Sequence, residues 1–120
     1  KVKSPGVLYK HYSPRCKTLL FTPENVENAI SACLAESLEN KGIAVLCEEK
    51  WISRFEKLHI KSLDLGKNQA EMAMRLYKLL REAEKICDVL IVIEPTEKDG
   101  IMKGVLNRLH KACASEDVAH

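Results

Sequence analysis

The sequence predicts an α/β fold in which a small parallel sheet of about four strands is flanked by helices. Two runs of strand length, Ile43–Cys47 and Val89–Ile93, consist of apolar residues only. Such runs are typical of strands that are buried on both faces of a parallel sheet. Segments in which apolar residues recur at helical spacing alternate with these runs, as in an α/β fold.

The N-terminal half predicts two strands separated by a helix. Residues 16–21 contain the apolar run that indicates the first strand, and Ile43–Cys47 is the second. Thr22 is placed to cap the intervening helix, with Pro23 at its first position. Gly42 suits the left-handed conformation that ends a helix. The residues that share the apolar face of this helix are Val26, Ile30, Cys33, Leu34 and Leu38.

The C-terminal half adds a short helix, two strands and two longer helices. The apolar residues within 48–57 recur at helical spacing and predict a short helix. Residues 58–63 fit a third strand, although polar residues interrupt its apolar pattern. Asn68 and Glu71 form a capping-box pattern that begins the next helix. A fourth strand, Val89–Ile93, follows that helix. The apolar faces of the two helices comprise Met72, Leu76, Leu79, Leu80, Ala83 and Ile86 or Cys87 in one, and Ile101, Val105, Leu109, Ala112 and Cys113 in the other.

This succession of elements predicts a Rossmann-like sheet with strand order 3-2-1-4 and right-handed crossovers. One domain, residues 16–120, contains it, because a chain of 120 residues with 46% apolar composition builds one core. Residues 1–15 precede the domain as a linker.

Composition argues against several classes of function. The net charge of +2 is too small to support nucleic-acid binding. No apolar run reaches the length of a membrane span and no secretory signal is visible, so we expect a cytoplasmic protein. The five cysteines include no Cys-x-x-Cys pair and mostly fall in apolar segments, which indicates reduced, buried thiols. Cys16 has no evident partner.

The common phosphate and metal motifs are also missing from the sequence. The turn at residues 21–25 has no glycine to let the backbone approach a pyrophosphate, and Glu24 would repel one. His59, His110 and His120 stand without a second ligand at the spacing of a helix or a zinc finger. We therefore expect no dinucleotide site, no metal site and no catalytic residue in this domain.

Residues 4–14 are the least ordinary stretch of the chain. Pro5 and Pro14 each fix φ and push the preceding residue toward extended geometry, which predicts an extended strap. Such a strap can lay its polar groups against an anionic ligand, or can serve only as a linker whose tyrosines dock on the domain. The residues of this candidate site are Ser4, Pro5, Gly6, Tyr9, Lys10, His11 and Tyr12.

The strap resembles the interdomain linker of the two-domain threonylcarbamoyl-AMP synthases, whose pattern reads roughly Ser-Pro-Gly-Met-Lys-Tyr-Lys-His-Tyr-Ala-Pro. Val7 and Leu8 replace the Met and the first Lys of that pattern. Residues 100–109 are similar to a second family pattern, Gly-Leu-Gly-x-Ala-Ile-Met-Asn-Arg-Leu, with Met102 replacing its second Gly and Gly104 its Ala. Two polar residues of that match, Asn107 and Arg108, lie off the apolar face, where they can reach a partner surface or a phosphate.

The resemblance covers the whole chain, which is similar to the family's smaller C-terminal domain and lacks the catalytic domain that precedes the linker. It implies a parent enzyme that joins L-threonine, bicarbonate and ATP to give threonylcarbamoyl-AMP and pyrophosphate for tRNA modification. The parent would use ATP and magnesium, whereas this domain alone would bind no cofactor. The implied partners are the catalytic domain and later tRNA-modifying proteins, while direct tRNA contact has no support in the sequence.

Two other classes of function stay open on the sequence. The domain could hold a nucleotide or an effector at the carboxyl ends of its strands, with residues 94–100 and Arg108 as the lining. Alternatively, it could be a purely structural docking module, which an exposed apolar patch would favour.

Overall fold

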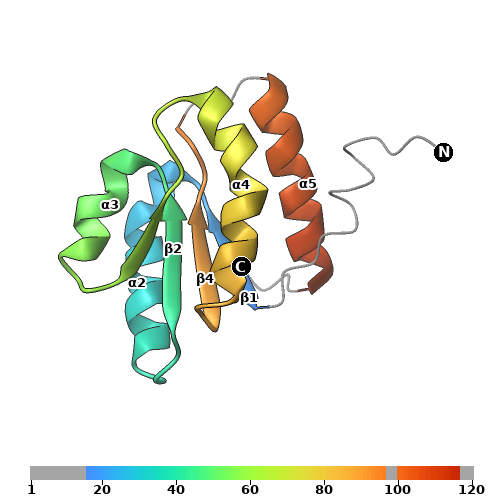
Figure 1. The fold of residues 1–120 in the computed structure, drawn as a ribbon. Coiled ribbons are helices and arrows are strands. Elements are labelled where there is room, and N and C mark those ends of the chain that lie inside the picture. Colours follow the sequence, from blue (N-terminus) through green and yellow to red (C-terminus); the bar gives the residue numbers. More distant parts are fainter. Residues whose placement is uncertain (1–15, 97–99, 117–120) are drawn as a thin grey trace.

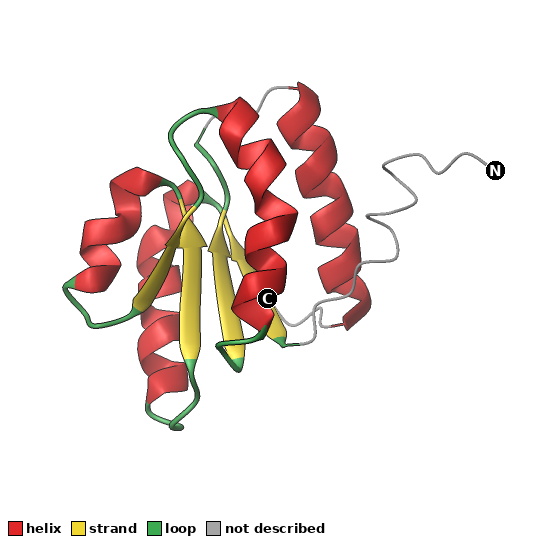
Figure 2. Ribbon diagram, in the orientation of Figure 1, coloured by secondary structure: helices red, strands yellow, loops and turns green. Residues whose placement is uncertain are grey.

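The computed structural model describes residues 16–96 and 100–116, in which helices cover both faces of a four-stranded parallel sheet (Figure 1). This arrangement, also visible in Figure 2, confirms the predicted α/β class. The strands are β1 (Lys17–Phe21), β2 (Ile43–Cys47), β3 (Lys61–Asp64) and β4 (Val89–Ile93). The helices are the 3-10 turn η1 (Pro23–Asn25), α2 (Val26–Ser37), α3 (Glu49–Glu56), α4 (Gln69–Glu84) and α5 (Gly100–Glu116).

The strand order is β1-β4-β2-β3, so the predicted order 3-2-1-4 is wrong. β4 lies between β1 and β2: Ile91 pairs with Leu19 on one side and with Val45 on the other. All five side chains of β4 are buried, whereas Lys17 at the start of β1 is exposed. The most apolar strand gains most from burial between two neighbours, so the partly polar β1 occupies an edge.

Alternate residues of the central strands point into two separate cores. α4 and α5 cover one face and α2 and α3 cover the other, so the prediction of helices on both faces is confirmed. Strand residues of the α4–α5 core are Ala44, Leu46, Leu90 and Val92. Strand residues of the α2–α3 core are Val45, Cys47, Val89, Ile91 and Ile93.

Helix α2 packs on a narrower stripe than the sequence predicts. Val26, Ala29 and Cys33 are buried, whereas Leu34 is 47% exposed and Leu38, just beyond the helix, is 86% exposed. The stripe has a spacing of three and four residues and consists of small side chains, which let the helix approach the sheet closely. Leu34 directly follows Cys33, and because adjacent helical residues point in different directions, its side chain is exposed to solvent.

The ends of α2 also differ from prediction. Thr22 precedes the 3-10 turn η1 and makes no side-chain cap bond to the backbone; its hydroxyl accepts a hydrogen bond from the Asn25 side chain. Asn40, with φ of 61°, takes the left-handed conformation that the sequence predicts for Gly42. Asparagine tolerates this conformation better than most residues. Gly42 instead donates its N–H to Asp88 Oδ2 at 2.8 Å.

The capping of α4 follows the predicted pattern. The Asn68 side chain accepts the N–H of Glu71 at 3.0 Å, and Glu71 Oε1 accepts the N–H of Lys67 at 3.1 Å. The return bond therefore reaches one residue further back than in a standard capping box. The predicted apolar face is buried from Met72 to Ala83. No helix in the described part of the chain is long and apolar enough to cross a membrane.

Candidate functional site

The strap that carries the main candidate site, residues 4–14, lies outside the described residues. The roles predicted for Ser4, Pro5, Gly6, Tyr9, Lys10, His11 and Tyr12 therefore stay predictions. The fold does fix where the strap joins the domain, because Cys16 directly precedes β1 at the edge of the sheet where the strands begin. We call the end of the sheet at which its parallel strands begin the amino edge, and the end at which they finish the carboxyl edge.

Helix α5 carries the second candidate pair. Asn107 is exposed between the buried Leu106 and Leu109, as predicted for a residue off the apolar face. Arg108 follows it in the same helix turn. Met102, which departs from the family pattern, is fully buried in the α4–α5 core. A methionine at this position thus fills core volume, in place of the close backbone approach that a glycine permits.

The carboxyl edge of a parallel sheet is the usual place for a ligand in α/β proteins. Here an acidic residue ends or directly follows three of the four described strands: Glu48 after β2, Asp64 at the end of β3 and Glu94 after β4. Glu48 Oε1 accepts hydrogen bonds from the backbone N–H and the hydroxyl of Thr96, at 2.9 and 2.8 Å. Asp64 Oδ1 accepts the N–H of Gly66 at 2.8 Å. Both carboxylates are therefore used to hold loops.

Glu94 is the most buried acid of this edge. It is 4% exposed, and its Oε2 lies 2.5 Å from Nε2 of His110 on α5. Its backbone N–H donates to the carbonyl of Phe21 at 2.9 Å, which ties the end of β4 to the end of β1. A phosphate at this edge would therefore meet carboxylates, whose negative charge opposes its binding. The described residues contain no group of three His, Cys, Asp or Glu side chains that could hold a metal.

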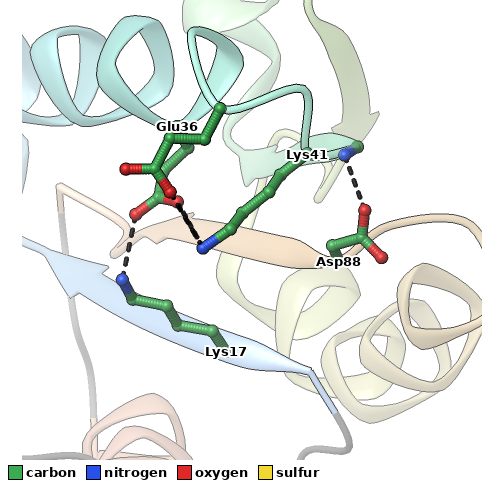
Figure 3. A network of polar contacts seen from close by, with 6 residues as sticks. Lys17, Glu36, Lys41 and Asp88 are labelled. Carbon is green, nitrogen blue, oxygen red and sulfur yellow. Dashed lines mark hydrogen bonds and ion pairs between the residues drawn. The ribbon is translucent and has the colours of Figure 1, made fainter.

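The amino edge has a different composition. Figure 3 shows Lys17 of β1 and Lys41 of the α2–β2 loop on either side of Glu36. The Lys17 Nζ to Glu36 Oε2 distance is 2.9 Å and the Lys41 Nζ to Glu36 Oε1 distance is 3.4 Å. The hydrogen bond from Lys17, supported by Lys41, lowers the pKa of Glu36 against the effect of its burial. These ion pairs link the C-terminal end of α2 to the start of β1 and to the α2–β2 loop.

Two cysteines meet at the same edge, which corrects the expectation that Cys16 has no partner. The side chains of Cys16 and Cys87 lie within hydrogen-bonding reach of each other, and both are half-buried. Cys87 is therefore not a fully buried core residue. Cys33 and Cys47 are buried, as predicted, and burial raises the pKa of Cys33 to about 11 and that of Cys47 to about 12. These four thiols are free.

Comparison with known proteins gives a consistent result. The family model for the threonylcarbamoyl-AMP synthase C-terminal domain matches residues 1–114. A threonylcarbamoyl-AMP synthase of Schizosaccharomyces pombe is 28% identical over 120 residues, covering 93% of this chain and 29% of the relative. One of Pyrococcus abyssi is 27% identical over 113 residues, covering 92% of this chain and 32% of the relative.

The fold agrees with these sequence matches. A crystal structure of P. abyssi Sua5 complexed with L-threonine superposes with a TM-score of 0.67 at 26% sequence identity, covering 87% of this chain and 30% of that one. The present chain thus spans less than a third of the length of these relatives. Because the family model spans nearly all of it, the chain belongs to the threonylcarbamoyl-AMP synthase C-terminal domain family.

Proposed function

We propose that this chain is the accessory C-terminal domain and the ligand-covering linker of a threonylcarbamoyl-AMP synthase. The parent joins L-threonine, bicarbonate and ATP to give threonylcarbamoyl-AMP and pyrophosphate, which serves tRNA modification. The observation that carries the proposal is the family match over residues 1–114, which includes the strap as well as the folded domain. The relative crystallised with L-threonine supports this amino acid as a substrate.

The strap is the part of the chain that acts on the ligand. Nucleotidyl transfer from ATP develops negative charge on the phosphates, and positioned cations or hydrogen-bond donors stabilise that charge. Lys10 and His11 supply a cation and an imidazole for this purpose. Tyr9 and Tyr12 wall the site against water, which would hydrolyse an activated carbamate. Leu8 replaces the lysine of the family pattern, so the strap carries one cation fewer.

The folded domain is a frame for the strap and does not itself bind the reactants. The carboxyl edge supports this role, because its acids are engaged with Thr96, Gly66 and His110 and would repel a nucleotide. ATP and magnesium belong to the catalytic domain in this proposal. Asn107 and Arg108 form the contact of α5 with that domain or with the ligand. The same reasoning disfavours an independent nucleotide-binding module.

The direct test replaces His11 in a full-length synthase that contains this domain. His11→Ala should lower ATP turnover to pyrophosphate about tenfold or more, since one charge-assisted contact to phosphate is worth roughly 1.5–3 kcal/mol. Lys3→Ala is the matched control, because it removes a charge from the same segment outside the family pattern. Equal turnover of both variants and the wild type would remove His11 from the lid.

A docking role is the second candidate, and one observation favours it. Leu34 of α2 and Leu38, just beyond the end of α2, are both exposed large apolar side chains. In the full-length protein, Leu38→Glu should weaken the association of the two domains, seen as separate unfolding transitions in calorimetry. Glu39→Gln, next to it in sequence and also exposed, should leave a single transition.

A further inference from the structure

The pair formed by Cys16 and Cys87 is a consequence of the strand order. Lys17 is opposite Val89 in the β1–β4 register, so the residues that lead into these two strands are neighbours. Cys16 directly precedes β1, and Cys87 stands in the turn between α4 and β4. Both side chains pack against the α4–α5 core and are half-buried, in contrast to the buried Cys33 and Cys47.

The environment makes the two thiols unequal. The Cys87 thiol has one proton and two acceptors within reach, Sγ of Cys16 and the Ala83 carbonyl at 3.1 Å. The interaction of the Cys87 thiol with Cys16 lowers the pKa of Cys16 to about 7. The same interaction and burial raise the pKa of Cys87. Glu84 opposes ionisation of Cys16, and Asp88 opposes that of Cys87. Cys16 is thus the more readily ionised thiol of the pair, and Cys87 keeps its proton more strongly.

We propose that Cys16 and Cys87 are a peroxide-sensitive dithiol that closes to a disulfide between the start of β1 and the α4–β4 turn. The Cys16 thiolate attacks one oxygen of hydrogen peroxide, the O–O bond breaks, and hydroxide leaves and takes up a proton. Cys87 then loses its proton and attacks the resulting sulfenic acid at sulfur. The S–S bond forms as the S–O bond breaks, so two thiols lose two electrons and one peroxide becomes two waters.

The bond would join the two strands at a position that matters for the strap. Cys16 begins the folded domain, so the disulfide ties the junction with residues 1–15 to the central strand β4. It also closes a loop that contains every element from β1 to α4. Such a link restricts the unfolded chain and raises the melting temperature. A thiol reductant of the glutathione class reverses it.

The test exposes the 120-residue chain to hydrogen peroxide in slight excess near neutral pH. Free thiols are then alkylated and peptides are mapped by mass spectrometry, with thermal unfolding measured in parallel. We expect a peptide that links Cys16 to Cys87, a higher melting temperature, and loss of both after treatment with dithiothreitol. Cys33 and Cys47 should remain alkylatable after unfolding, because both are buried in the native state.

Single variants separate the role of Cys16, which peroxide oxidises, from that of Cys87, which attacks the sulfenic acid. Cys87→Ser should leave a Cys16 sulfenic acid that dimedone traps, whereas Cys16→Ser should lose both the link and the trapped adduct. Cys33→Ala is the control that keeps the link. An unpaired Cys16 sulfenic acid in the wild-type chain, a bond from Cys16 to Cys113, or no oxidation at all would overturn the proposal. None of these outcomes depends on synthase activity.

Discussion

At the carboxyl edge of the sheet, Glu48 and Asp64 accept hydrogen bonds from neighbouring loops and Glu94 contacts α5. At the amino edge, two lysines share the Glu36 carboxylate, and a pair of thiols lies where the strap joins the domain. The usual ligand edge of an α/β fold is thus committed to internal contacts, whereas the reactive side chains gather at the opposite edge.

Under the proposed function, this domain uses its Rossmann-like architecture to support the strap. The family resemblance assigns ligand contacts to the strap, and the strap enters the domain at the amino edge. The acids of the carboxyl edge should therefore matter for stability and not for ligand binding.

Glu94→Ala should lower the free energy of unfolding by about 2 kcal/mol, because it removes a buried carboxylate that contacts His110. Urea denaturation measures the change. Glu82→Ala, which removes an exposed carboxylate on α4, is the matched control and should change stability much less. If the two variants were equally stable, Glu94 would have no structural role, and the carboxyl edge would be open to a functional one.

Glu48→Ala should cost about 1 kcal/mol, because the Thr96 N–H and hydroxyl lose their shared acceptor at the rim of the sheet. Thr96→Val removes only the hydroxyl donor and should cost less. Unfolding of the two single variants and the double variant gives the coupling energy of the pair. Strictly additive losses would contradict the hydrogen bond between these side chains.

Glu36→Gln tests the amino edge and should have the smallest effect, because Lys17 and Lys41 are partly solvent-exposed. The folded state lowers the pKa of Glu36, so its contribution is present above the unfolded pKa of about 4.3. That contribution disappears as the pH falls through the lowered folded pKa. The stability difference between wild type and variant should therefore shrink in acid and at high salt. A difference that is constant with pH would contradict the ion pairs.

Much of the fold could be predicted because local signals agreed with the final packing. The apolar runs of β2 and β4 and the Asn68 cap of α4 are examples. The strand order could not be predicted, since it depends on which strand gains most from two neighbours. Leu34 and Leu38 were misplaced because apolar spacing alone does not reveal that small residues set the contact stripe of α2.

The candidate site was predicted to a smaller extent. The exposure of Asn107 followed from helical periodicity, and the strap followed from its prolines and its family pattern. The thiol pair had no signal in the sequence, because Cys16 and Cys87 are distant along the chain and meet only through the β1–β4 register. The internal hydrogen bonds of the carboxyl edge have no sequence signal for the same reason, since the partners of its acids come from separate loops and helices.

The most direct test of the central claim is an NMR titration of this chain with ATP and magnesium. If the domain is a frame, the amides around Glu48, Asp64 and Glu94 should show no saturable shift, and any change should be confined to the strap. Saturable shifts at Glu94, Thr96 and Asn107 would contradict the account, because they would place a ligand site at the carboxyl edge of the domain itself.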